Sequence, residues 1–216
     1  MLVALFVLTT PTRAYEANNI SNLIIHHQNQ LLNVTPVKTQ VALVNKKSAV
    51  HADDICGQAA LKAERDYQIK PELLQTIAMV ESGRWNKKLH RRMAWPWTVQ
   101  SNGHGQYYKT KEEAVAAVKA LQAQGITNID VGCMQINLKY HGQAFNSVEE
   151  ALEPEKNVAY GARFLQKLYQ KNGHNWQKTA MQYHSKNHTK GMNYKNRLER
   201  HYAAYINPAP QQSLFE

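Results

Sequence analysis

The spacing of apolar residues from Asp53 onward predicts a chain made mostly of helices. Asp53 and Asp54 are good N-caps for a first helix, whose apolar positions follow at helical spacing. Pro71 is expected at the first position of a second helix, which runs to Ser82 and is stopped by Gly83. Three later helices are expected at about 157–171, 175–185 and 192–205.

The pattern changes between the second of these helices and residue 157. An Asn-Gly turn within 101–105 lies between the runs 95–100 and 106–109, which predicts a small β-hairpin. Thr110-Lys-Glu-Glu113 is a capping box that opens another helix, closed by Gly125. Residues 130–137 are expected to form a loop. The predicted fold class is therefore mainly α, with a helical domain and one small β-hairpin insertion.

The length of 216 residues favours one globular domain with extensions, and we place that domain at 53–205. Residues 1–14 are mostly apolar and end in small residues, which predicts a signal peptide and export to the periplasm. A buried N-terminal strand or helix is the other interpretation. Residues 15–52 are expected to be a loosely ordered leader, and 206–216 a tail. No other segment has the length of a membrane span, so an integral membrane protein is not expected.

The chain is basic, with 26 Lys and Arg against 16 Asp and Glu and a formal net charge of +10. This excess favours an anionic partner, which could be nucleic acid, a membrane surface or an acidic polymer of the cell wall. The basic residues look dispersed and no nucleic-acid-binding motif is present, so nucleic acid is not the expected partner.

The two cysteines, Cys56 and Cys133, would most simply form one disulfide in an oxidising compartment. The alternative is a pair of buried free thiols. His184 and His188 have the i, i+4 spacing of metal ligands, but a third ligand is lacking. No metal and no cofactor are expected.

Glu81 is the most informative polar residue. It continues the apolar stripe of its helix, where a carboxylate is costly unless it is paired or protonated. Its place in the last helical turn opposes a negative charge as well. Both effects raise the pKa of the carboxyl toward the range that a general acid needs. The alternative is a capping glutamate at a frayed helix end, paired with Arg84.

Two further features are ambiguous when taken alone. Gly132-Cys-Met-Gln-Ile-Asn137 contains amide side chains that can bind sugar hydroxyl and acetamido groups, but it also fits an ordinary turn before a helix. Tyr183 shares a helical face with Trp176 and Ala180, so its phenol should point inward and need a partner. A core tyrosine is the simpler interpretation.

Taken in order, Glu81-Ser82, the Gly-Cys-Met-Gln-Ile-Asn segment and Tyr183 resemble the soluble lytic transglycosylases. The resemblance covers about 53–205 and implies the lysozyme-like fold that this family shares with goose-type lysozymes. The form Asp-Val-Gly-Cys-Met-Gln is similar to the branch that serves secretion and conjugation machinery, which would make an envelope-spanning complex a partner. The Trp95-Pro-Trp97 segment and the hairpin are similar to an insertion found in part of the family.

The resemblance also implies a role for each matching residue. Glu81 would be the only catalytic acid and base, and Tyr183 would donate a hydrogen bond to it. The residues expected to orient Glu81 or to contact substrate are Ser82, Met134, Gln135, Asn137 and His184. Two positions depart from the family, because Cys133 replaces Leu or Ile and His184 replaces Asn. The first departure fits a disulfide that anchors this loop to the first helix.

The activity implied is cleavage of the bond between N-acetylmuramic acid and N-acetylglucosamine in peptidoglycan, with formation of 1,6-anhydro ends. Two alternatives remain open. An inverting lysozyme would need a second carboxylate, for which Asp130 is the candidate, although Asp130 also fits a loop cap. A non-catalytic peptidoglycan-binding protein would bind the cell wall without turnover.

Overall fold

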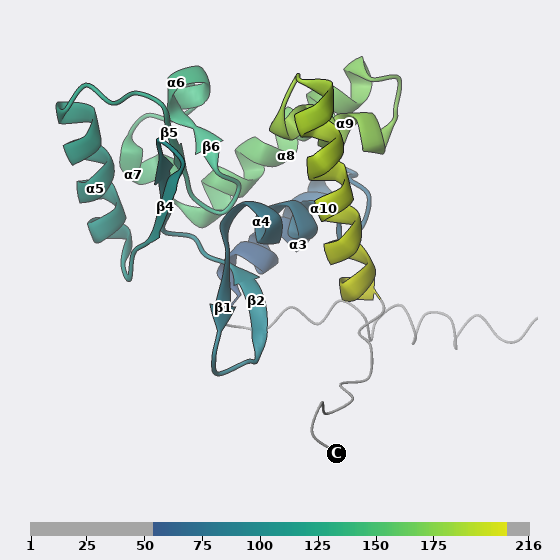
Figure 1. The fold of residues 1–216 in the computed structure, drawn as a ribbon, viewed down its shortest axis with the longest axis horizontal. Helices are drawn as coiled ribbons and strands as arrows, with labels where there is room; N and C mark the ends of the chain where they lie inside the picture. Colours follow the sequence, from purple (N-terminus) through teal and green to yellow (C-terminus); the bar gives the residue numbers. More distant parts are fainter. Residues whose placement is uncertain (1–53, 207–216) are drawn as a thin grey trace, which may run out of the picture. The chain divides into compact units, whose positions relative to one another are not determined.

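The computed structural model describes residues 54–206, which fold mainly into helices with small antiparallel sheets (Figure 1). The predicted signal peptide, leader and C-terminal tail lie outside these residues, apart from Ile206. The helices are α3 (Ile55–Asp66), α4 (Leu73–Ser82), α5 (Lys111–Ala123), α6 (Leu138–His141), α7 (Val148–Ala151), α8 (Pro154–Lys171), α9 (Trp176–His184) and α10 (His188–Ile206), with a 3-10 turn at Gly142–Ala144. No helix within 54–206 is long and apolar enough to cross a membrane.

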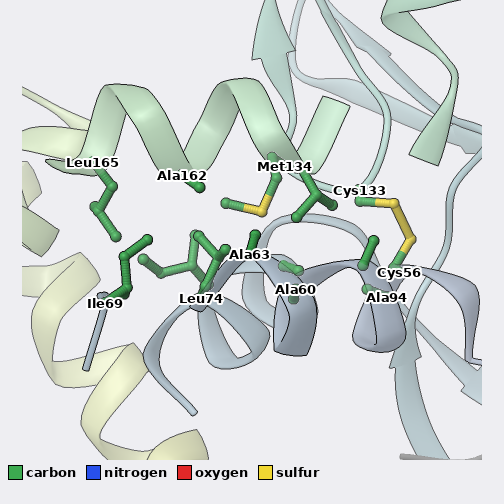
Figure 2. Packing of buried hydrophobic residues seen from close by; sticks show 14 of the residues in the cluster. Cys56, Ala60, Ala63, Ile69, Leu74, Ala94, Cys133, Met134, Ala162 and Leu165 are labelled. Carbon is green, nitrogen blue, oxygen red and sulfur yellow. A yellow bond between two sulfur atoms is a disulfide. The ribbon is translucent and has the colours of Figure 1, made fainter. Parts of the chain in front are cut away.

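The main core lies between α3, α4 and α8, and Figure 2 shows α8 lying across α3. Asp54 caps α3 as predicted, because its Oδ1 accepts from the amide of Gly57 at 2.8 Å. The buried face of α3 contains Ala59, Ala60 and Ala63, whose small side chains let α8 approach closely. The predicted Cys56–Cys133 disulfide is present and joins α3 to the segment before β6.

Helix α4 begins at Leu73, so the prediction that Pro71 occupies its first position is wrong. The reason is a buried side chain from α3. The Glu64 carboxylate accepts from the backbone amides of Glu72, Leu74 and Gln75 at 2.8–3.1 Å, and these are the donors that a helix start leaves free. Glu72 itself has a φ of 66°, which breaks the helical path immediately before Leu73. Gly83 follows the last residue of α4, as predicted.

The predicted hairpin is formed by β3 (Thr98–Ser101) and β4 (His104–Tyr107), and it belongs to a larger sheet. Within 130–137, where a loop was expected, β5 (Ile129–Val131) and β6 (Ile136–Asn137) form strands. The order β4-β3-β5-β6 places the insertion directly beside β5, with Gln100 opposite Asp130. A second hairpin, β1 (Gly83–Asn86) and β2 (Arg91–Ala94), was not predicted. Figure 1 shows it projecting from the end of α4.

Helices α5, α8, α9 and α10 agree with the sequence except at some of their ends, whereas the short helices α6 and α7 were not predicted. Thr110 caps α5 through the amide of Glu113, as predicted, and Asn175 caps α9, which was predicted to begin at about residue 175. Helix α8 begins at Pro154, three residues before the predicted start, because Pro is accepted in a first turn. Helix α10 begins at His188 instead of about residue 192.

Candidate functional site

Glu81 lies in the last turn of α4 and opens into a cavity of about 310 Å³. The side chain is 14% exposed, so it is largely removed from water and still reachable from the cavity. The walls come from strands on one side and from α8 and α9 on the other. The predicted site residues that line this cavity are Glu81, Asp130, Gln135, Asn137, Tyr183 and His184.

The surroundings of Glu81 raise its pKa from 4.5 to about 7. Loss of hydration is the largest cause, and the nearby Asp130 carboxylate adds to it. Tyr194 and Arg197 act in the opposite direction and favour the ionised form. At neutral pH the carboxyl is therefore divided between its protonated and ionised forms, as the sequence predicted from its position on the apolar stripe.

The segment 131–134 forms the floor behind Glu81, and four side chains hold its backbone carbonyls. Asn157 of α8 donates to the Val131 carbonyl at 3.0 Å, and Gln135 donates to the Gly132 carbonyl at 3.0 Å. Ser82 of α4 donates to the Cys133 carbonyl at 2.8 Å, and Tyr183 of α9 donates to the Met134 carbonyl at 3.0 Å. Asn157 also accepts from the amide of Met134 at 2.8 Å. Together with the disulfide to α3, these bonds fix the loop relative to four helices, α3, α4, α8 and α9.

Gly132 is needed in this loop for two reasons. Its φ is +81°, and a Cβ at this position would lie 2.4 Å from Asn157 Nδ2. The glycine was identified from the sequence, but Asn157 was not. The sequence has no signal for Asn157, because its full burial and its several partners depend on how the helix packs against the loop.

Three expected contacts differ from the prediction. Tyr183 donates to the Met134 carbonyl, so the expected hydrogen bond from Tyr183 to Glu81 is wrong. Ser82 is fully buried and bonds the Cys133 carbonyl, so it supports the loop and does not line the cavity. The Met134 side chain is also buried and packs beneath Gly161 in the core (Figure 2). A sequence motif does not distinguish side chains that line a cavity from those that support it.

Gln135 and Asn137 do reach the cavity, where they hold polar groups in place. Gln135 has a φ of 47°, and its Nε2 donates to the Gly132 and Thr98 carbonyls. Asn137 Nδ2 donates to Asp130 at 2.8 Å, which lowers the pKa of Asp130, while burial raises it by more. Asp130 therefore lies in a strand beside the cavity and accepts a hydrogen bond there.

His184 and Tyr194 form a stacked pair next to Glu81. Their rings are parallel within 1° with centroids 4.4 Å apart, and His184 Nδ1 lies 3.9 Å from Glu81 Oε1. Burial, Arg197 and Lys190 lower the pKa of His184, which favours the neutral ring. The buried Tyr194 hydroxyl interacts with Glu81 and lowers its pKa, although it completes no hydrogen bond of good geometry within the described region.

Tyr194 and an aromatic wall of the cavity were not predicted from the sequence. His141 Nδ1 lies 2.7 Å from the Tyr160 hydroxyl, and the His141 ring packs on Phe164 with centroids 4.9 Å apart. These three side chains and Tyr140 line the same cavity, which gives it flat surfaces of the kind that sugars pack against. In 54–206 no group of three or more His, Cys, Asp and Glu is arranged to hold a metal ion.

Comparison with known families agrees with this geometry. The family model described as "Transglycosylase SLT domain" matches residues 58–206, which include every element from α4 to α10. Comparisons with curated proteins and with solved structures gave no significant match. The predicted mainly helical, lysozyme-like fold class is confirmed, and the domain is that of transglycosylases acting on peptidoglycan. The chain therefore belongs to the transglycosylase SLT domain family, in the lysozyme-like superfamily.

Proposed function

We propose that this protein is a lytic transglycosylase in which Glu81 is the single acid and base. The observation that supports this most directly is the pKa of about 7 for a carboxyl that faces a polar cavity in an SLT domain. A carboxyl with this pKa can both give and take a proton near neutral pH.

The reaction uses one carboxyl twice, first as an acid and then as a base. Protonated Glu81 gives its proton to the glycosidic oxygen as the bond from the muramyl anomeric carbon breaks. The acetamido group of the substrate stabilises the positive charge at that carbon. The Glu81 carboxylate then takes the proton of the muramyl 6-hydroxyl, whose oxygen closes on the anomeric carbon. The products are a free 4-hydroxyl and a 1,6-anhydro end, and no water is consumed.

Other side chains have supporting roles in this proposal. Gln135, Asn137 and His184 contact the glycan, because their polar atoms line the cavity. Tyr183 and Ser82 position the loop that faces the substrate. Tyr194 interacts with Glu81 directly and favours its ionised form after the first proton transfer.

A hydrolase is the second candidate, since Asp130 shares the cavity with Glu81. In an inverting enzyme Asp130 would have to be an ionised base that activates water. The hydrogen bond from Asn137 favours this ionised form, which also raises the pKa of Glu81 in a transglycosylase. The products of the reaction therefore separate the two candidates. A non-catalytic cell-wall binder is the third candidate.

Mass spectrometry of the products released from purified sacculi separates all three. We expect 1,6-anhydro ends. Reducing ends would identify the hydrolase, and binding without release would identify the inert binder.

The disulfide and the SLT domain fit a location outside the cytoplasm. We place the mature protein in the periplasm, with peptidoglycan as its substrate and an envelope-spanning secretion complex as a partner. Cell fractionation with an intact and a truncated residue 1–14 segment tests the export signal.

A further inference from the structure

Positive charge is concentrated in one segment that the proposed chemical step does not use. Between Glu81 and Glu112 the chain has seven Lys and Arg and no Asp or Glu. This segment therefore has a net charge of +7, while the whole chain has a net charge of +10. The expectation that basic residues are dispersed is therefore wrong. Five of the seven lie on the β1–β2 hairpin: Arg84, Lys87, Lys88, Arg91 and Arg92.

One face of this hairpin is fixed to the body of the domain. The Arg84 guanidinium lies 3.6 Å from the centre of the Trp95 ring, and Arg91 lies 3.7 Å from the Asp54 carboxylate. These contacts engage the side chains of Arg84 and Arg91, which are two of the five basic residues of the hairpin. They also hold the hairpin in a defined position at the end of α4, so that its other face has a fixed direction.

The opposite face and the turn are exposed. Trp85 pairs with Arg92 across the strands and is 55% exposed. Tyr107 of β4 is 43% exposed, and its hydroxyl donates to the Gly83 carbonyl at 2.9 Å, an oxygen that also accepts from the Arg92 guanidinium. The side chains at the turn form no ion pair with residues 54–206. We call the following set the hairpin surface: Trp85, Lys87, Lys88, His90, Arg92 and Tyr107.

The positive charge continues from the hairpin surface toward Glu81. Arg92, Arg197 and Arg200 all lower the pKa of His201, after the larger effect of burial, so the hairpin and α10 share one positive region. Arg197 lies 5.2 Å from the centre of the Tyr194 ring, which stacks on His184 beside Glu81, so the other end of this region lies at the candidate site. A polyanion held at Glu81 would therefore meet cations along α10 and then on the hairpin.

We propose that the hairpin surface binds the carboxylates of the peptide stems on the glycan strand that the cavity holds. This inference rests on the proposed function, because it takes peptidoglycan as the polymer at Glu81. Each stem presents carboxylates beside the sugars, and exposed cations attract them over about one Debye length, ~8 Å at physiological salt. The exposed Trp85 and Tyr107 rings supply flat apolar faces for the sugars or the peptide. Such contacts would retain the enzyme on peptide-bearing strands.

Binding to sacculi in an inactive background tests this proposal. A Glu81→Gln protein is compared on intact sacculi and on sacculi stripped of their stem peptides by an amidase. We expect roughly tenfold tighter binding to the intact polymer at about 0.05 M salt, and a smaller ratio at about 0.3 M, because salt screens exposed charges. Adding Lys87→Glu and Lys88→Glu should remove most of this preference.

A matched charge reversal provides the control. Lys167→Glu with Lys171→Glu on α8 makes the same change in net charge at two other exposed lysines, and it should keep the preference for intact sacculi. Lys87→Gln with Lys88→Gln should give a smaller loss than the reversal, and thermal melts establish that each variant folds. Equal binding to intact and stripped sacculi would overturn the proposal. An equal loss in the α8 control would overturn it too.

Anionic lipid is the competing occupant, and vesicles test it. Phosphatidylcholine vesicles with and without phosphatidylglycerol replace the sacculi in the same assay. If the lysines at the turn are required for binding the anionic vesicles but not for the preference between sacculi, the surface binds lipid and the proposal is wrong. Because these measurements use the inactive protein, their failure leaves the product analysis unaffected. Absence of anhydro products would in turn contradict only the proposed chemistry.

Discussion

The two ends of α4 each have an acidic side chain removed from water, and the two acids are in opposite electrostatic settings. At the N-terminal end, Glu64 accepts three backbone amides and the Gln75 side-chain amide at 2.8–3.1 Å. The helix dipole there favours a negative charge. At the C-terminal end, Glu81 meets the negative end of the same dipole, and its closest ring nitrogen, His184 Nδ1, is 3.9 Å away.

This difference separates a structural acid from a chemical one. Burial raises the pKa of both carboxyls, but four hydrogen bonds oppose that rise at Glu64 and hold its oxygens in place. Glu81 has a cavity in front of it and fewer donors that bond to its oxygens. A buried carboxyl is therefore available for proton transfer only where the protein leaves its hydrogen-bonding capacity unused.

The largest expected effect comes from removing the titratable proton of Glu81, at the C-terminal end of α4. Glu81→Gln keeps the shape and loses the acid, so release of muropeptides from sacculi should fall by about 10²–10⁴-fold. Product release measured by chromatography checks this, and a thermal melt establishes that the variant is folded. Turnover close to that of the parent would exclude Glu81 as the acid.

Removing Glu64, whose carboxylate caps the N-terminal end of α4, should lower the stability of the fold instead of the activity. Glu64→Ala leaves buried amides at the start of α4 without their acceptor, and we expect a loss of about 4 kcal/mol in the free energy of unfolding. Urea denaturation measures it. Glu155→Ala, at an exposed position in α8, should change the stability by no more than about 0.5 kcal/mol. A loss of similar size in both variants would contradict the capping role of Glu64.

The pH dependence of stability should distinguish wild type from Glu81→Gln. The pKa of Glu81 is raised from 4.5 to about 7 on folding, so the folded state holds this proton more tightly than the unfolded state. Wild type therefore loses stability as the pH rises through that range, and the variant lacks this contribution. The stability of Glu81→Gln relative to wild type should increase by about 3 kcal/mol from acid pH to pH above 7. Urea denaturation at several pH values tests it, and a constant difference would mean that Glu81 has an ordinary pKa.

Two tyrosine substitutions should have the smallest effects, and of different kinds. Tyr183→Phe removes the donor to the buried Met134 carbonyl and should cost about 1–2 kcal/mol, with little change in the pH profile. Tyr194→Phe should move the alkaline limb of the activity profile to higher pH, because the Tyr194 hydroxyl lowers the pKa of Glu81. Melting temperatures and pH–rate profiles of both variants decide between these roles. If Tyr183→Phe moved the limb instead, the hydrogen bond would reach Glu81 in solution.

Local chemistry made much of the fold predictable. Side-chain caps at Asp54 and Thr110 begin their helices as expected, and the Asn-Gly turn forms its hairpin. These signals act over a few residues, so the sequence contains them completely. The start of α4 was misplaced because its cap comes from Glu64 in another helix. The β1–β2 hairpin was missed because its nine central residues, 84–92, are mostly basic and lack strand alternation.

In the candidate site too, some features were predictable from the sequence and others depended on tertiary packing. Helical spacing placed Glu81 on the buried stripe, and burial is the main cause of its raised pKa. Periodicity also placed Tyr183 inward, but it could not tell which acceptor its hydroxyl would reach. Tyr194 and Asn157 gave no motif of their own, since their burial and their partners depend on packing between elements that are distant in the sequence.

Motifs, caps and helical periods can be read along the chain, and they were enough to identify the family, the main helices and the acid on which the proposed chemistry depends. Packing between distant elements established that Tyr194 interacts with Glu81, that Tyr183 and Ser82 hold the loop, and that positive charge extends from the hairpin to α10. The physical reason is distance. Hydration, hydrogen bonds and charge act over a few ångströms in space, between residues that lie far apart along the chain.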